Sequence, residues 1–167
     1  SGTDQQIIEE KATVEKQFDY AKELWTLPAF LSVPQHFPPE ESRENELYGY
    51  RAKLQLAYLF EPDEPDEAMG CYSELADQNL DSVLKAFGLI GQANLYLRQG
   101  QRSKAAQCVD TLTDVLATQE QMRSGNRTGW LERWTQRLDP ALREDLTNAL
   151  RTRLPSLSPR GGRGTGS

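Results

Sequence analysis

Residues 82–117 read SVLKAFGLIGQANLYLRQGQRSKAAQCVDTLTDVLA, and this stretch decides the fold. Its apolar residues recur every three or four positions on both sides of Gly100, which predicts two amphipathic helices. A glycine just after Arg98 and Gln99 is typical of a helix end. Because the connection is short, the two helices are expected to pack antiparallel as a hairpin. Neither apolar stripe is stable in water alone, so further helices must cover the pair.

A second copy of this hairpin precedes the first in the chain. Residues 53–59 (KLQLAYL) align with residues 91–97 (GQANLYL) at an offset of 38. After the turn the offset is 37, and it aligns Ala68, Cys71, Tyr72 and Leu75 with Ala105, Cys108, Val109 and Leu112. Self-similarity at such a period predicts an array of helical repeats.

These residues resemble the tetratricopeptide repeat family, whose repeats are helix-turn-helix units of about 34 residues. The family's small, aromatic and turn positions are filled in the downstream copy by Ala93, Tyr96, Gly100, Ala105 and Val109. The upstream copy keeps Tyr58, Ala68, Tyr72 and Leu75, but it has Gln55 where a small residue is expected and Pro62 near the expected glycine. The resemblance implies an all-α fold, a short right-handed solenoid of antiparallel helix hairpins with repeats at about 44–77 and 82–117.

The flanking segments predict helices that cover the ends of this array, within one domain spanning residues 3–154. Thr3 or Asp4 is expected to cap a packing helix that runs to about Trp25. Four prolines within residues 27–42 predict an irregular segment, which either packs its apolar side chains on the helices or occupies a ligand groove. Residues 127–154 predict two capping helices, the second opened by Asp139-Pro140.

The two ends of the chain have compositions unlike the rest. Ser1-Gly2 is typical of the remnant left when a purification tag is cleaved. Residues 155–167 contain mainly Ser, Pro, Arg and Gly, so they are expected to form a disordered tail or linker. The single RGG-like run at residues 160–164 is a weak signal for RNA contact.

The charge is unevenly distributed along a chain whose net charge is −6. Residues 1–77 carry a net charge of −11 and residues 78–167 a net charge of +5. This asymmetry indicates either solvated helix faces or an acidic surface for a basic partner. No apolar run is long enough to span a membrane, and the sequence leaves the compartment open while favouring the cytoplasm.

Few residues in the sequence are candidates for catalysis or metal binding. His36 is the only histidine, and no nucleophile or second metal ligand accompanies it in the sequence. Cys71 and Cys108 hold equivalent repeat positions, which favours buried packing residues over a disulfide. The acidic run at residues 61–67 lacks the ligand spacing of a calcium loop. Gly88 lies inside a predicted helix, where it indicates a close helix crossing. The sequence therefore predicts no enzyme, no cofactor and no metal.

The resemblance implies that the inner side of the first helix of each repeat forms a groove for a peptide or a partner helix. The positions expected to face this groove are Ala52, Leu56, Leu59, Phe60, Ile90, Asn94, Leu97 and Arg98. The predicted function is a non-catalytic scaffold or adaptor that binds another protein. Two alternatives stay open. One is a small acidic chaperone for an apolar segment of an exported protein, and the other is a nucleic-acid-associated protein that uses the arginines of residues 123–163. Nucleic acid is the less expected partner, and no oligomeric state is predicted.

Overall fold

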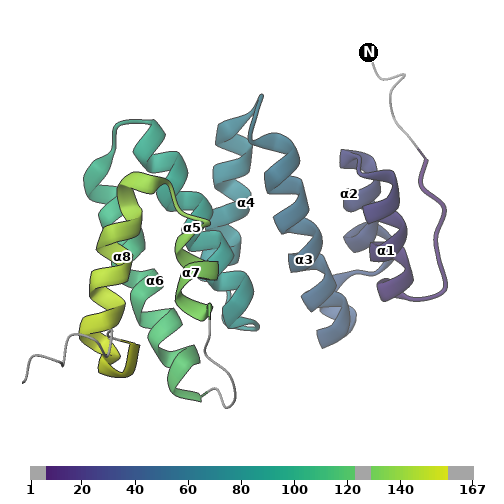
Figure 1. The fold of residues 1–167 in the computed structure, drawn as a ribbon. Helices are drawn as coiled ribbons and strands as arrows, with labels where there is room; N and C mark the ends of the chain where they lie inside the picture. Colours follow the sequence, from purple (N-terminus) through teal and green to yellow (C-terminus); the bar gives the residue numbers. More distant parts are fainter. Residues whose placement is uncertain (1–6, 123–128, 158–167) are drawn as a thin grey trace, which may run out of the picture. The chain divides into compact units, whose positions relative to one another are not determined.

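The computed structural model describes residues 7–122 and 129–157. These residues form eight α-helices and two short 3-10 helices, with no β-strand among them (Figure 1). The prediction of an all-helical fold is therefore confirmed. By its internal contacts the chain divides into two compact units, Ser1–Gly88 and Leu89–Ser167. The boundary falls within helix α5 (Ser82–Arg98), so its two halves are described with their own units.

The first unit begins with a helical hairpin made of α1 (Val14–Leu24) and α2 (Leu27–His36) (Figure 1). Thr13 and Thr26 cap these helices with their side chains. Between them Trp25 adopts the left-handed conformation, with φ of 53°, and ends α1. The two helices lie side by side, and α2 also contacts α3. The N-terminal part of the protein is thus a helix pair, where the sequence predicted a single helix and a loop.

The prediction that residues 27–42 are irregular is wrong for the first ten of them. Pro28 lies in the first turn of α2, where its missing N–H would have no partner inside the helix. Pro34 does remove one helical hydrogen bond, but the helix persists because Phe30 and Val33 in the preceding turn are completely buried. After α2, a 3-10 helix at Pro39–Glu41 leads to Ser42, which caps α3.

The predicted start of the first helix is also wrong. Residues 7–11 have no helical structure, and α1 begins only at Val14. The cause is local, because the Thr13 hydroxyl accepts a hydrogen bond from the backbone N–H of Lys16 and so fixes the helix start. The preceding backbone is held by side chains of α1 and α2. The proposed caps Thr3 and Asp4 and the Ser1-Gly2 remnant lie outside the described residues.

The core of the first unit is formed by α1, α2 and α3 (Arg43–Phe60). The buried ring of Phe30 packs against two other aromatic rings: its centroid lies 6.2 Å from that of Phe18 and 5.4 Å from that of Trp25, the latter edge to face. The buried members of this core are Ile8, Val14, Phe18, Ala21, Ala29, Phe30, Val33, Ala52 and Leu56. The face of α3 that carries Ala52 and Leu56 is therefore covered by the α1–α2 hairpin.

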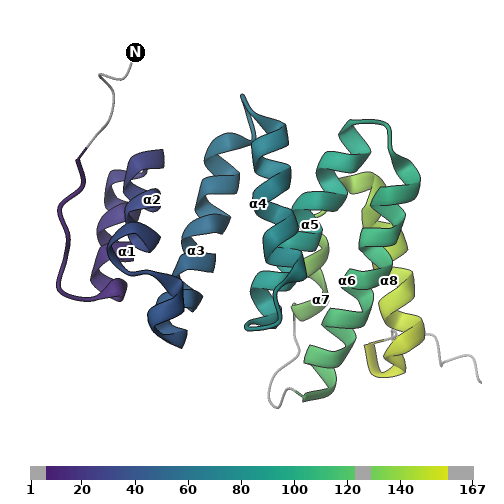
Figure 2. The same ribbon diagram turned by 180° about the vertical axis from the view of Figure 1, so that it is seen from behind.

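Helix α4 (Pro65–Asp77) pairs with the other side of α3 in an antiparallel hairpin (Figure 2). The Tyr72 hydroxyl donates a 2.6 Å hydrogen bond to the Glu61 carboxylate at the turn. At the far end of α4, the Gln78 side-chain oxygen accepts from the backbone N–H groups of Leu80 and Asp81. The Asp81 carboxylate then accepts from Leu84 N, which starts α5. The upstream predicted repeat is therefore a helix pair, as the sequence indicates.

The second unit contains the end of α5, then α6 (Arg102–Met122), α7 (Trp130–Thr135) and α8 (Pro140–Arg153), followed by a 3-10 helix at Pro155–Leu157. Gly100 has φ of 77° in the turn after α5, a conformation that glycine adopts without strain. Asp139 caps α8 through a 2.9 Å hydrogen bond from Ala141 N. The turn at Gly100 and the cap at Asp139-Pro140 are confirmed predictions. Most of the predicted tail, residues 158–167, lies outside the described residues.

Candidate functional site

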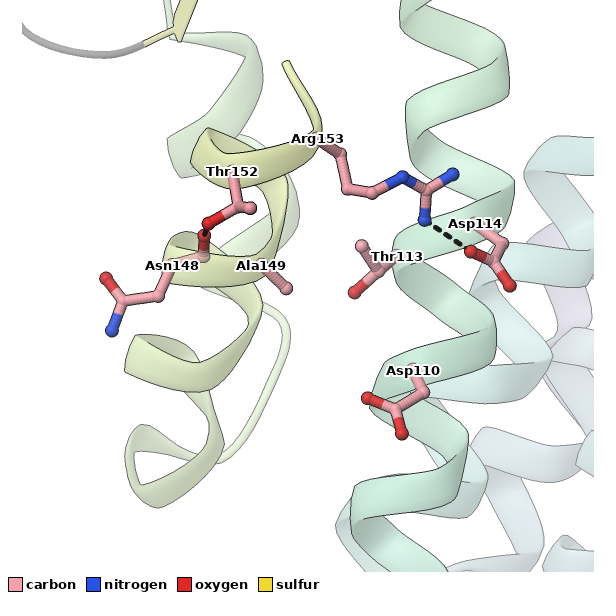
Figure 3. Close-up of a pocket in the computed structure, with 7 residues that line it drawn as sticks. All are labelled: Asp110, Thr113, Asp114, Asn148, Ala149, Thr152 and Arg153. Carbon is pink, nitrogen blue, oxygen red and sulfur yellow. Dashed lines mark hydrogen bonds and ion pairs between the residues drawn. The ribbon is translucent and has the colours of Figure 1, made fainter. Parts of the chain in front are cut away.

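A cleft between α6 and α8 is the candidate site in the second unit (Figure 3). Its volume is about 450 Å³, within the usual range for ligand pockets. The two helices lie side by side, and their facing surfaces form the two walls. The lining residues are Asp110, Thr113, Asp114, Asn148, Ala149, Thr152 and Arg153.

Helix geometry explains why these side chains share the cleft. On α6, Asp110, Thr113 and Asp114 are three and four positions apart, so they lie on one face of the helix. On α8, Asn148 and Thr152 are four positions apart and occupy successive turns of the facing wall. Each helix buries leucines on its adjacent apolar side, which fixes the orientation of both walls, and these are Leu112, Leu116, Leu146 and Leu150.

The electrostatic character of the cleft is set by two carboxylates and one guanidinium. Arg153 reaches from α8 across to Asp114 on α6 and forms an ion pair with it (Figure 3). Both side chains are largely exposed, so the pair stabilises the fold by less than about 1 kcal/mol. Asp110 lies one helical turn away, and its carboxylate has no hydrogen-bond or ion-pair partner among the residues that the structure describes.

The hydroxyl groups of the cleft are already used within their own helices. Thr113 Oγ1 donates to the carbonyl of Val109 at 2.8 Å, and Thr152 Oγ1 donates to the carbonyl of Asn148 at 2.9 Å. The lining contains no histidine, cysteine or lysine. What the cleft offers to a ligand is therefore the anionic Asp110 side chain and the methyl group of Ala149, which points toward α6, whereas the Asn148 amide points away from α6 (Figure 3).

The four groove positions predicted on α3 are covered by the first hairpin. Ala52 and Leu56 are buried in the core with α1 and α2, and Leu59 and Phe60 pack partly buried against the same core. In the structure these side chains contact the chain's own helices. A ligand would reach this face only after α2 had moved away.

The four positions predicted on α5 have different environments within the second unit. Ile90 is buried, Leu97 is half-buried and Arg98 is exposed. Asn94 has a role that the sequence does not reveal. Its Nδ2 donates to the carbonyl of Arg137 at 3.0 Å, and its Oδ1 accepts from Asp139 N at 2.8 Å. Its amide thus holds the turn between α7 and α8.

Replacing Asn94 by alanine is expected to destabilise the second unit by about 1–3 kcal/mol, since the N–H of Asp139 and the carbonyl of Arg137 would lose their protein partner. Urea unfolding followed by circular dichroism measures this change. Gln107→Ala is the control, because Gln107 is exposed on α6. If the two variants unfold at the same urea concentration, Asn94 does not hold the turn and its amide is free for a ligand.

The two cysteines are free thiols that differ in exposure, because Cys71 is only partly buried. Cys108 is buried on α6, and desolvation raises the pKa of its thiol. Desolvation also raises the pKa of Cys71 on α4, although Lys53 opposes the shift. A raised pKa keeps both thiols protonated near neutral pH and lowers their reactivity. Both therefore behave as packing residues.

The cleft residues were not predicted as a site. Asp110 and Asp114 appear in the sequence as part of an ordinary polar helix face, and nothing marks them apart from other acidic side chains. Their significance arises only from the packing of α8 against α6, about 40 positions later in the chain. No sequence signal at residues 110–114 would have identified the cleft.

Comparisons with known proteins assign neither a family nor a function to this chain. No family model matches the chain, and no curated protein or solved structure is significantly similar to it. Within residues 7–122 and 129–157, no helix combines the length and apolar character needed to cross a membrane. The same residues contain no cluster of three or more His, Cys, Asp or Glu side chains that could hold a metal ion.

Proposed function

We propose that this protein is a non-catalytic interaction module, built from tetratricopeptide-like hairpins, whose α6–α8 cleft binds a peptide or helix bearing a basic side chain. The observation that carries the proposal is the Asp110 carboxylate, which lies in an open cleft without a partner among the described residues. One turn away, the fold already contains such a contact, because the guanidinium of Arg153 forms an ion pair with Asp114 in the cleft. A cationic side chain from a partner would pair with Asp110 in the same way.

The repeat character of the hairpins is supported by burial at equivalent positions. On α4, Ala68, Tyr72 and Leu75 are at most 2% exposed. Their counterparts on α6, 37 residues later, are Ala105, Val109 and Leu112, which are at most 3% exposed. Such matching is expected when each hairpin buries the same stripe of its second helix.

A peptide or helix fits this cleft better than a small catalytic substrate. The walls are two helices, and a helix or an extended peptide is a common ligand of a groove on a protein surface. The lining side chains offer ionic and hydrogen-bonding groups without a nucleophile paired to a base. The proposal places the ligand on α6 and α8, because on α3 the face expected from the family resemblance is covered by α1 and α2.

The alternative of nucleic-acid binding gains no support from Arg143 and Arg153, two arginines that the structure describes in the second unit. Arg143 donates to the carbonyls of Leu138 and Gln136, and Arg153 pairs with Asp114. Both guanidinium groups therefore serve contacts inside the fold.

The proposal is tested by fluorescence anisotropy with labelled amphipathic peptides of about 16 residues, roughly four helical turns, that carry either arginine or glutamine on one face. The arginine peptide is expected to bind, and Asp110→Lys should weaken its binding about tenfold through charge repulsion in the cleft. The matched control is Asp145→Lys on α8, an exposed carboxylate outside the cleft that changes the net charge equally. Equal weakening by both variants, or equal binding of both peptides, would contradict the proposal.

A further inference from the structure

The N-terminal segment 7–11 has no helical structure and runs alongside α1 (Figure 1), and we call it the strap. Two neighbouring isoleucines in it have opposite environments. Ile8 is buried in the core of the first unit, with 7% of its surface exposed, whereas Ile7 is 96% exposed. An extended segment that buries one side chain and exposes the next contacts its support as a bound peptide does.

The strap's backbone is held by a buried amide. Gln17 on α1 has no exposed surface, and its Oε1 accepts from Lys11 N at 2.6 Å. Its Nε2 donates to the carbonyl of Glu9 at 3.1 Å and to Ser32 Oγ at 3.0 Å. Ser32 in turn donates to the carbonyl of Ala29, which fixes the position of the amide. Gln17 therefore contacts one N–H and one C=O of the strap, as the backbone of a neighbouring strand would.

Three more contacts involve side chains around the strap. His36 Nε2 lies 3.0 Å from the carbonyl oxygen of Ile8, and its Nδ1 lies 3.5 Å from the Glu10 carboxylate. The ammonium group of Lys11 lies over the ring of Tyr20, 4.1 Å from its centre. Backbone groups supply most of the polar contacts, so selectivity comes from the aliphatic residue and from the cation three positions later.

We propose that the α1–α2 hairpin is a second peptide-binding site, and that the strap occupies it in cis as an internal competitor. The partner it fits is an extended segment of another protein with a branched aliphatic residue followed, three positions on, by lysine or arginine. The residue in the Lys11 place must retain its N–H, which excludes proline there. This site lies in the first unit, so its test does not depend on whether the α6–α8 cleft binds a ligand.

A tethered strap has an effective concentration on the order of millimolar, so it excludes a weak external peptide from the wild-type protein. Ile8→Lys is expected to release the strap, because it places a charge in the core position that anchors it. The probe is a labelled synthetic peptide with the sequence of residues 7–13, and its binding to the full-length protein is measured by anisotropy. Ile8→Lys should bind it at least about tenfold more tightly than wild type.

The controls separate the site from general effects of charge and folding. Ile7→Lys carries the same charge at the neighbouring exposed position and should bind the probe no better than wild type. Adding Gln17→Leu to Ile8→Lys should abolish the gained binding, because the amide that holds the backbone is lost. Ile8→Ala is the milder variant if Ile8→Lys lowers the helical circular dichroism signal, and it should also gain affinity.

Three results would overturn the proposal. The first is equal binding by wild type, Ile8→Lys and Ile8→Ala. The second is equal binding of a probe in which aspartate replaces its second isoleucine. The third is a wild-type dimer that forms with rising concentration and is lost on Gln17→Leu, since the occupant in trans would then be the strap of a second copy and not a separate partner.

Discussion

Replacing Phe30 by alanine is expected to destabilise the first unit by about 3–5 kcal/mol, the usual cost of removing a fully buried aromatic ring. Phe30 has no exposed surface and packs against the rings of Phe18 and Trp25. The cavity left by the substitution would lie at the centre of the core shared by α1, α2 and α3. Urea unfolding followed by circular dichroism and tryptophan fluorescence measures the loss.

The control is on the same helix and at the next residue. Leu31 is 41% exposed, so Leu31→Ala should change the free energy of unfolding by less than about 1 kcal/mol. This pair tests whether residues 27–36 form a packed helix. Similar small effects for both substitutions would mean that the segment is a surface loop, as the prolines in the sequence suggested.

Replacing Gly88 by alanine is expected to destabilise the first unit by about 1–3 kcal/mol through overpacking. A Cβ atom at this position would lie 2.6 Å from Ala76 N, 2.7 Å from Tyr72 O and 2.8 Å from Leu75 Cβ. Two of these atoms belong to the backbone of α4, so relief requires the helices to separate. The substitution should lower the midpoint of thermal unfolding measured by calorimetry.

Gly70 provides a control with the opposite sign. It also lies inside a helix, but a Cβ atom there would meet nothing within 4 Å. Gly70→Ala is therefore expected to stabilise the protein by roughly 0.5–1 kcal/mol, because alanine loses less conformational freedom in a helix than glycine does. If both substitutions shifted stability in the same direction, the close approach of α5 to α4 at Gly88 would be contradicted.

Several features of the fold follow directly from local sequence signals. Gly100 ends α5 with a positive φ, and Asp139-Pro140 opens α8, both as predicted. Gly88 marks a close helix crossing, which the sequence indicated and which the short distances from a Cβ atom at this position to α4 confirm. Two of these signals depend on the backbone alone, because glycine adopts a positive φ at a helix end without strain and proline in the first turn of a helix removes no intrahelical hydrogen bond.

The errors arose where tertiary contacts outweigh local preference. The proline at position 34 predicted an irregular segment. Burial of Phe30 and Val33 compensates for the loss of the helical hydrogen bond that Pro34 cannot donate. The predicted first helix included the strap, yet backbone groups of the strap bond to Gln17 and His36 instead of forming helical hydrogen bonds. Intrinsic helix preference does not reveal such contacts, because they depend on how the side chains pack in the folded unit.

The candidate site was less predictable than the fold. Asn94 had the position of a groove residue, but its amide is used by the turn that contains Arg137 and Asp139. That turn lies more than 40 residues away in sequence. Likewise, the cleft carboxylate of Asp110 acquires its environment from α8, and only the packed structure brings the two walls together.

The central claim, that the α6–α8 cleft receives a basic peptide, is tested most directly by nuclear magnetic resonance of the isotopically labelled protein titrated with the arginine peptide. The account predicts that backbone amide shifts change progressively and cluster at the cleft, at Asp110, Thr113, Asp114, Asn148 and Thr152. It also predicts that Asp110→Lys removes these changes while Asp145→Lys retains them. Shifts that are absent, or that spread over the acidic surface without a maximum at α6 and α8, would contradict the claim.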